Sequence, residues 1–169
     1  MIANRSWLQE AARVTLASNG AKTPGIDGID KQAMTCDLQH QLDMIRAELL
    51  AGSYQPQPAR RVYIPKANGK QRPLGIPTLR DRIVQRAMLM AMEPIWESDF
   101  HRLSYGFRPE RSVHHAIRTV KLQLQDNTHT SGRWVIEGDL ASYFDTVHHK
   151  LLMKCVRKRI RDARFLSLL

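Results

Sequence analysis

One aspartate stands where a short apolar run ends. Residues 133–139 (RWVIEGD) predict a strand that finishes on the carboxylate of Asp139. Magnesium prefers oxygen ligands, so Asp139 and the backbone carbonyl of Leu140 could supply two of them. Such a metal lowers the pKa of an attacking hydroxyl and neutralises a phosphate leaving group. Taken alone, an aspartate here is more often a cap or turn residue. The nearby Asp145 is interpreted as the N-cap of the following helix.

A second pattern surrounds a turn dipeptide. Residues 61–64 (RVYI) and 71–76 (QRPLGI) are rich in β-forming residues and lie on either side of Asn68 and Gly69. An Asn-Gly pair between two such runs favours a tight hairpin turn. The sequence therefore predicts a β-hairpin over residues 60–76.

Cationic side chains lie on this predicted hairpin. Lys66 and Arg72 flank the turn, where a guanidinium could form forked contacts with a triphosphate and an ammonium could act as a point charge. Lys70 and Arg60 are weaker candidates for the same role. Solvated charge explains these two equally well.

The elements that must position these residues are mostly helical. Apolar residues recur at three- and four-residue steps, which predicts helices over residues 6–18, 31–50, 79–96, 112–124 and 148–159. In the third helix, Thr78 is the predicted N-cap and Asp81 lies three residues on. In the last, the residues expected to face inward are Leu151, Leu152, Cys155 and Val156.

The charge of the chain is unevenly placed. The net charge is +10, yet residues 1–58 hold 5 Lys and Arg against 6 Asp and Glu, while residues 59–169 hold 21 against 10. This excess favours a polyanionic partner, because cations that reach phosphates release condensed counterions. A solvated basic face remains the alternative. The sequence shows no long apolar run, so no membrane span is expected, and the two cysteines are interpreted as structural thiols of a reducing cytoplasm.

Four stretches resemble one family in the same order along the chain. They are residues 23–29 (TPGIDGI), 62–88 (VYIPKANGKQRPLGIPTLRDRIVQRAM), 104–117 (SYGFRPERSVHHAI) and 134–149 (WVIEGDLASYFDTVHH). Together they closely resemble the bacterial group II intron reverse transcriptases, also called intron-encoded maturases. The resemblance runs over roughly residues 20–169.

The resemblance implies an α+β fold: a helix-rich fingers subdomain with a β-hairpin, plus the first part of a right-hand polymerase palm. Residues 1–130 would be fingers-like, and residues 131–169 would begin the palm. Asp139 matches one of three aspartates that hold Mg2+ in the family. Phe144 matches an aromatic residue that packs beneath the sugar and selects deoxynucleotides, although core packing is its alternative.

The resemblance also implies partners: template or intron RNA, an incoming dNTP and a DNA primer. The candidate RNA-binding residues are Arg60, Arg61, Lys70, Arg80, Arg82, Arg86, Arg108 and Arg111. Of these, Arg108 and Arg111 either touch the template backbone or brace their own loop. Phe107, between Gly106 and Arg108, is expected to fill the core.

The chain lacks one signature of the family. No Asp-Asp dipeptide occurs in the 169 residues, so the Tyr-x-Asp-Asp turn that completes the metal site is missing. We therefore expect an incomplete polymerase, a fragment or truncated product that does not catalyse alone. One alternative is an RNA-binding maturase module that assists intron splicing without synthesis, and another is a remnant without function.

Overall fold

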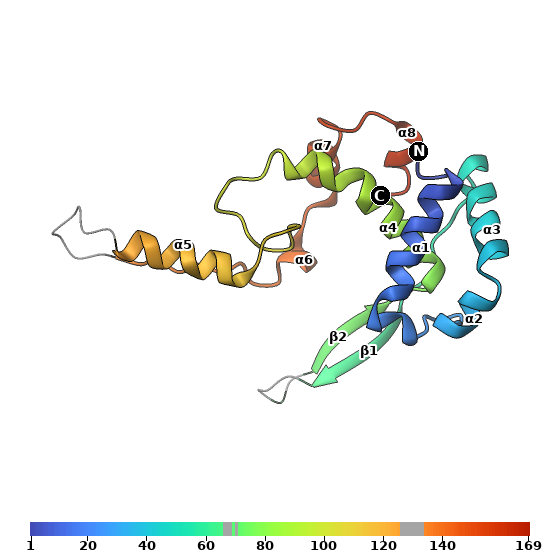
Figure 1. Cartoon of the computed structure of the whole chain (residues 1–169), viewed down its shortest axis with the longest axis horizontal. Coiled ribbons are helices and arrows are strands. Elements are labelled where there is room, and N and C mark those ends of the chain that lie inside the picture. The colour runs from blue at the N-terminus through green and yellow to red at the C-terminus, as the bar shows by residue number, and fades with distance from the viewer. Residues whose placement is uncertain (66–68, 70, 126–133) are drawn as a thin grey trace. The chain divides into compact units, whose positions relative to one another are not determined.

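The computed structural model describes residues 1–65, 69, 71–125 and 134–169, without the side chain of Asp145. These residues form two compact units, Met1–Ile95 (unit 1) and Trp96–Leu169 (unit 2), each with its own packing (Figure 1). In the part of the chain that is described, no helix is long and apolar enough to cross a bilayer. The fold is mixed and rich in helices, as expected for the α+β class.

Unit 1 begins with helices that pack side by side. Its helical elements are α1 (Arg5–Ala17), the 3-10 turn η1 (Asn19–Lys22), α2 (Lys31–Cys36) and α3 (Leu38–Ala51). Asn4 caps α1 by accepting a hydrogen bond from the backbone N–H of Trp7 at 3.2 Å. The single helix predicted over residues 31–50 is wrong in one respect: it is interrupted at Asp37, whose φ of −123° and ψ of 24° leave the helical region.

Helix α4 (Leu79–Glu97) completes the helical layer of unit 1. The predicted cap is confirmed, since the Oγ1 of Thr78 accepts a hydrogen bond from the backbone N–H of Asp81 at 3.1 Å. The indole N–H of Trp7 donates to the backbone carbonyl of Ala87 at 2.9 Å and so ties α1 to α4. The buried apolar residues of the unit come from these helices and the segments beside them: Ile2, Leu8, Ala11, Ala12, Leu16, Ala21, Met34, Leu42, Ile45, Leu49, Tyr54, Leu79, Ile83, Val84, Ala87 and Met88.

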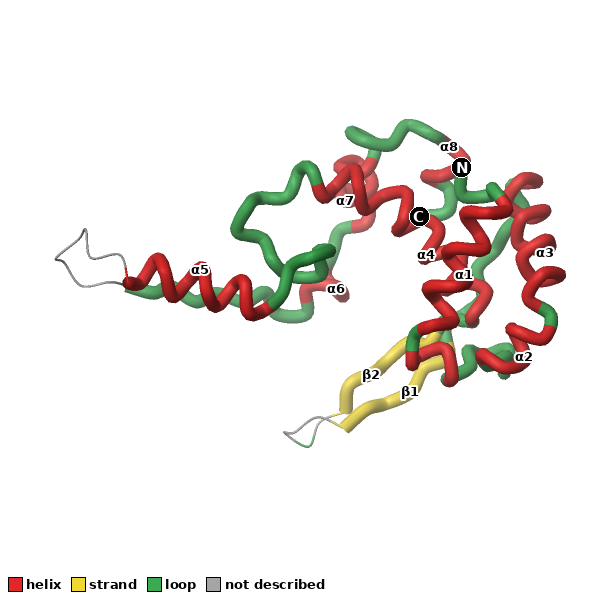
Figure 2. Tube along the Cα trace, viewed as in Figure 1, coloured by secondary structure: helices red, strands yellow, loops and turns green. Residues whose placement is uncertain are grey.

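The predicted hairpin is confirmed. Strands β1 (Arg60–Pro65) and β2 (Gln71–Ile76) pair antiparallel, with Arg60 opposite Ile76 and Ile64 opposite Arg72. Gly69, in the turn, has a φ of 76°, in the left-handed region that favours glycine. Figure 2 shows the two strands side by side in yellow, and they are the only strands among the described residues.

Unit 2 is built from α5 (Val113–Gln125), α6 (Tyr143–Thr146), α7 (His149–Val156) and α8 (Ala163–Leu166). Its one buried apolar residue in the described part is Val156. The inward orientation predicted for Leu151, Leu152 and Cys155 is therefore wrong, because all three are exposed. An amphipathic helix buries its apolar stripe only where another element covers it, and α5 buries no residue at all.

Two local predictions in unit 2 also fail. Residues 134–139 are not a strand, and the physical reason is that a strand needs a hydrogen-bonded neighbour, which no described residue provides. The predicted cap at Asp145 is wrong as well, since this residue lies within α6 and the N-cap of α7 is His148. The polar, turn-like segment that the sequence predicts over residues 126–133 lies outside the described residues.

Candidate functional site

The hairpin presents three described arginines. Arg61 and Arg72 are exposed, and Arg60 is half-buried at the base of β1. Side chains alternate along a strand, so Arg60 lies on the face of Ile64, and Arg72 lies on that face too because it is paired with Ile64. Four residues of strand separate the two positions, or about 13 Å. Lys66 and Lys70 lie outside the described residues.

A buried carboxylate joins the two ends of the hairpin. One oxygen of Asp81 accepts from the Tyr54 hydroxyl at 2.5 Å, and the other accepts from the Gln57 backbone N–H at 3.2 Å and the Thr78 hydroxyl at 2.7 Å. Tyr54 and Gln57 precede β1, whereas Thr78 follows β2. The base of the hairpin is therefore fixed by a residue of α4, and all three donors meet one acid that is 3% exposed.

Tyr54 responds to this environment. Burial, followed by the hydrogen bond to the Asp81 carboxylate, raises the pKa of the Tyr54 hydroxyl well above its ordinary value. The phenol therefore stays protonated and keeps donating over the whole neutral range.

Arg80 and Arg82 on α4 are engaged inside unit 1. Arg80 forms an ion pair with Glu48 of α3, and its guanidinium lies 5.9 Å from the ring centre of Tyr54. Arg82 donates to three backbone carbonyls, those of Pro77 at 2.9 Å, Gly20 at 2.8 Å and Thr23 at 2.7 Å. Burial lowers the pKa of the Arg82 guanidinium. These arginines brace the fold, and their RNA contact stays a prediction.

The loop held by Arg82 lies against the same junction. A Cβ on Gly25 would meet the Thr78 Cα at 2.6 Å, closer than side chains tolerate. Only glycine fits there, so the TPGIDGI stretch packs directly on the start of α4. Asp81 and Arg82, at the start of α4, thus bind two other segments of unit 1. Asp81 binds the segment before β1, and Arg82 binds residues 20–23.

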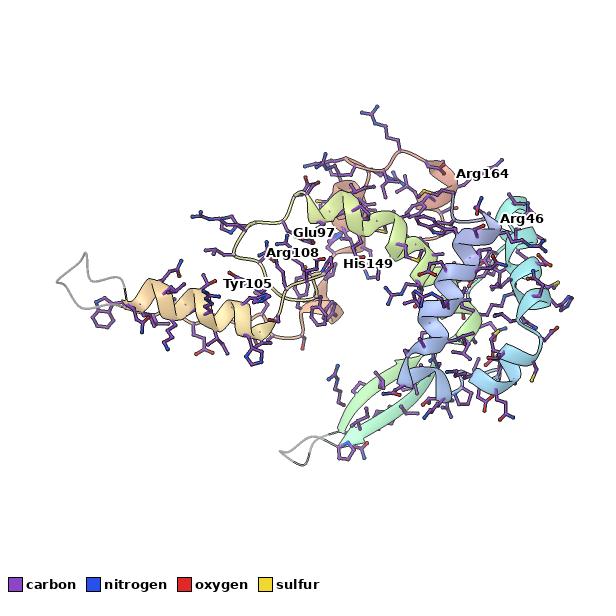
Figure 3. The ribbon with its side chains drawn as sticks, viewed as in Figure 1. Arg46, Glu97, Tyr105, Arg108, His149 and Arg164 are labelled. Carbon is purple, nitrogen blue, oxygen red and sulfur yellow. The ribbon has the colours of Figure 1, made fainter. Side chains whose placement is uncertain are left out.

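In unit 2, Arg108 organises the loop between α4 and α5. Its guanidinium binds the Glu97 carboxylate, with Nε 3.0 Å from Oε2, and donates to the carbonyls of His101 at 3.0 Å and Ser104 at 2.9 Å (Figure 3). Its side chain is 5% exposed. The hydrogen bond from Arg108 holds the pKa of the Glu97 carboxyl below its usual range. The Arg108 guanidinium also lies over the Phe100 ring, 5.1 Å from the ring centre.

Arg111 reinforces this loop. It donates to the carbonyls of Arg102 at 2.6 Å and Ser104 at 3.2 Å, and it stacks 5.3 Å from the ring centre of Tyr105. Bracing of the loop is therefore observed for Arg108 and Arg111. Contact of either residue with RNA stays a prediction, and so does that of Arg86, which is half-buried on α4.

The prediction that Phe107 fills the core is wrong. Its side chain is fully exposed, and its φ of 56° lies in the left-handed region. The buried guanidinium of Arg108 occupies the centre of the loop, and this bend of the backbone turns the preceding residue out to solvent.

Asp139, Leu140 and Phe144 lie together on one exposed segment. Phe144 is 85% exposed and meets Tyr143 edge-on, with 5.5 Å between ring centres, so core packing does not explain it in the described residues. Asp139 has the oxygen donor that magnesium prefers. Yet the described residues contain no group of three or more His, Cys, Asp or Glu that could hold a metal ion, so they do not by themselves fit a complete Mg2+ site.

The predicted site residues thus fall into two sets. Arg60, Arg61 and Arg72 belong to unit 1, whereas Asp139 and Phe144 belong to unit 2, and each set is described within its own unit. Sequence reasoning missed the residues that fix the first set, among them Glu48, Tyr54 and Gln57. One signal pointed to them: Asp81 is the only acid among the eight cations of residues 60–86, and a lone acid in such a run is a candidate for a buried acceptor.

The amino-acid sequence of this chain is similar to that of one known protein family and of several of its members. The family described as "Reverse transcriptase (RNA-dependent DNA polymerase)" matches residues 64–166, which include β2, α4 and the Asp139 segment. The chain is 73% identical to protein YkfC of Escherichia coli K12 over 169 residues, covering 100% of this chain and 44% of that protein. It is 36% identical over 159 residues to the group II intron-encoded protein LtrA of Lactococcus lactis, covering 90% of this chain and 24% of LtrA.

A eukaryotic relative extends the same comparison. An uncharacterized protein in the cob intron of Schizosaccharomyces pombe is 33% identical over 166 residues, covering 98% of this chain and 20% of that protein. The chain therefore spans less than half the length of each of these relatives. It belongs to the reverse transcriptase (RNA-dependent DNA polymerase) family, as a partial-length relative of group II intron-encoded proteins.

Proposed function

We propose that this chain is the N-terminal part of an RNA-directed DNA polymerase of group II intron type, which binds template RNA and an incoming dNTP. In this proposal the protein works on nucleic acid in the bacterial cytoplasm, residues 1–130 act as fingers and residues 131–169 begin the palm. The observation that carries it is the braced hairpin: its exposed cations rise from a buried junction, within a stretch that matches the family.

The hairpin supplies the nucleotide-binding role in this proposal. Arg72 is exposed on a paired strand whose base is fixed by Asp81, so little backbone ordering is needed when its guanidinium binds a triphosphate. Lys66 adds a second cation. The forked donors of arginine suit two phosphate oxygens at once.

Asp139 and Phe144 take the palm roles. The Asp139 carboxylate and the Leu140 carbonyl would contribute oxygen ligands to Mg2+, which supplies Lewis-acid chemistry when bound. Phe144 would pack beneath the sugar of the dNTP and exclude a 2′-hydroxyl. Its exposed ring is free to make that contact.

We further propose that the 169 residues do not catalyse on their own. One aspartate cannot organise two metal ions, and the chain has no Asp-Asp dipeptide to complete the carboxylate set. Binding of RNA does not require this set, so RNA binding and synthesis should separate.

The proposal is tested by the affinity of a fluorescent dNTP for the chain in complex with an RNA template and DNA primer. The variant Lys66→Ala/Arg72→Ala should lower that affinity about tenfold or more, because charge-assisted hydrogen bonds to phosphate are lost. A matched control is Lys31→Ala/Arg46→Ala, which removes the same charge from exposed positions on α2 and α3 that form no ion pair within the described residues. Equal effects of the two variants would contradict a nucleotide site on the hairpin.

The second candidate is an RNA-binding maturase module that assists splicing without synthesis. The intron-encoded relatives and the basic composition of residues 59–169 favour it. If this alternative holds, the affinity for RNA weakens with salt and does not change when dNTP is added. If the chain is part of a polymerase, dNTP stabilises its complex with primer and template.

A further inference from the structure

A basic segment in unit 2 lies outside every role assigned above. Between residues 154 and 164 (KCVRKRIRDAR) stand six Lys or Arg and one acid. The acid, Asp162, is engaged as the N-cap of α8, where its side chain accepts from the backbone N–H of Phe165 at 2.9 Å. Arg159 is engaged too, in an ion pair with Asp99.

The other five cations define what we call the basic segment: Lys154, Arg157, Lys158, Arg161 and Arg164. All five are exposed, and within the described residues their side chains have no hydrogen-bond or ion-pair partner. They span the end of α7, the following turn and the start of α8, and Figure 3 labels Arg164.

These side chains contrast with the arginines that sequence alone favoured. Arg82, Arg108 and Arg111 donate to backbone carbonyls of their own units, so a phosphate would have to displace those acceptors. The basic segment has no such internal acceptor to give up. A polyanion can therefore bind these five cations without breaking internal hydrogen bonds, which binding to Arg82, Arg108 or Arg111 would require.

The surface beside the segment is hollowed. Arg157 and Arg161 line a hollow of about 460 Å³, together with Ile160, Ala163, Leu166 and Ser167. Two guanidinium groups at one hollow provide several donors with no acid in the lining, whereas the Ser167 hydroxyl already donates to the Arg164 carbonyl at 2.8 Å. A phosphate with its sugar offers acceptors and a small apolar body, which matches this lining.

We propose that the basic segment is a second RNA-binding surface, which holds the phosphate backbone without reading sequence. The proposal rests on the proposed RNA-binding function and adds a site to it that is separate from the hairpin. Backbone recognition follows from the chemistry of the segment, because point charges and forked donors bind phosphate, whereas base recognition would need stacked aromatic rings or groove contacts.

The test is the salt dependence of RNA affinity, measured by fluorescence anisotropy with a short single-stranded RNA of mixed sequence. The variant Arg157→Gln/Lys158→Gln/Arg161→Gln removes three charges with no internal partner, so folding should be intact and is checked by circular dichroism. If each cation meets one phosphate, the slope of log K against log salt becomes shallower by about 2. Affinity at about 0.1 M salt should fall on the order of 10- to 100-fold.

The matched control is Lys22→Gln/Lys31→Gln/Arg46→Gln, which removes three exposed charges from η1, α2 and α3 that form no ion pair within the described residues. The proposal is overturned if this control changes the slope as much as the first variant does, because the segment would then be an ordinary solvated face. It is also overturned if the first variant loses binding only to phosphatidylserine vesicles and keeps its RNA affinity. If the unsubstituted chain binds no RNA even at low salt, the proposed function fails as well, and this distinguishes the two failures.

Discussion

Units 1 and 2 are stabilised in different ways. Unit 1 holds all the buried apolar residues of the described chain except Val156, and it adds a buried acid with three hydrogen-bond donors. Unit 2 relies on Arg108, whose guanidinium gathers the loop before α5 through a carboxylate and backbone carbonyls. Hydrophobic burial is the larger source of stability, so unit 1 should be the more resistant to unfolding.

The difference also separates two kinds of predicted site. The hairpin arginines of unit 1 lie on paired strands whose base is fixed by Asp81, so the backbone that carries them is ordered before any ligand binds. Asp139 and Phe144 of unit 2 lie on a segment with no strand partner in the described residues. In our account, the proposed nucleotide-binding residues of unit 1 therefore lie on a paired strand, and the proposed metal-binding residue of unit 2 does not.

The largest contrast should come from leucine truncation. Leu8 is 1% exposed and Leu151 is 59% exposed. Leu8→Ala should cost about 2–5 kcal/mol of unfolding free energy, because it leaves a cavity, whereas Leu151→Ala should cost under about 0.5 kcal/mol. Urea unfolding followed by circular dichroism measures both. Equal costs would show that unit 2 has a core comparable to that of unit 1.

Removing one hydroxyl from each unit gives a smaller contrast. Tyr54→Phe should cost about 1–3 kcal/mol, since it removes the donor to Oδ1 of the buried Asp81 carboxylate, while the donors to Oδ2 remain. Tyr105→Phe removes a half-buried hydroxyl that lies 2.6 Å from that of Thr119, and should cost about 0.5–1 kcal/mol. Hydrogen exchange should also show faster exchange of the β1 and β2 amides in Tyr54→Phe than in the parent chain. If those amides keep their rates, Asp81 does not fix the hairpin.

Replacing Arg108 tests the loop of unit 2. Arg108→Lys should expose residues 101–108 to limited proteolysis, because one ammonium cannot reach the Glu97 carboxylate and two carbonyls with the same geometry. Arg157→Lys is the matched control, since Arg157 has no such internal contacts in the described residues. Cleavage at parent rates in Arg108→Lys would mean that other contacts hold this loop.

The smallest expected effects are on pH dependence, and they have opposite signs in the two units. The pKa of Tyr54 is raised, so its contribution is fully present below the ordinary value of about 10 and is lost as pH rises towards the folded value. The pKa of Glu97 is lowered, so its contribution is present above about 4.3 and is lost as pH falls. Unfolding free energies measured against pH should therefore be flatter in alkali for Tyr54→Phe and flatter in acid for Arg108→Ala. Curves parallel to that of the parent chain would contradict these assignments.

The sequence predicts local structure well where the signal is local. The hairpin follows from Asn68-Gly69 between two β-rich runs, and the start of α4 follows from Thr78 and Asp81. Local sequence could not show whether residues 134–139 form a strand. A strand exists only when it pairs with a neighbour, and local sequence does not specify that neighbour.

The candidate site was predictable to a lesser degree. Residue type alone does not distinguish an arginine that binds carbonyls of its own fold, such as Arg82, from an exposed one such as Arg72. That distinction depends on contacts between Arg82 and residues about 60 positions away, which periodicity does not encode. The same limit concealed the role of Tyr54, which lies outside every predicted element.

The central claim is that this chain binds primer and template but does not extend the primer. One gel assay tests it directly: a labelled DNA primer on an RNA template is incubated with the chain, all four dNTPs and Mg2+, and both its mobility shift and its length are followed. We expect a salt-sensitive shift and no elongation. Template-dependent elongation would contradict the incomplete metal site, and the absence of any shift at low salt would contradict nucleic-acid binding.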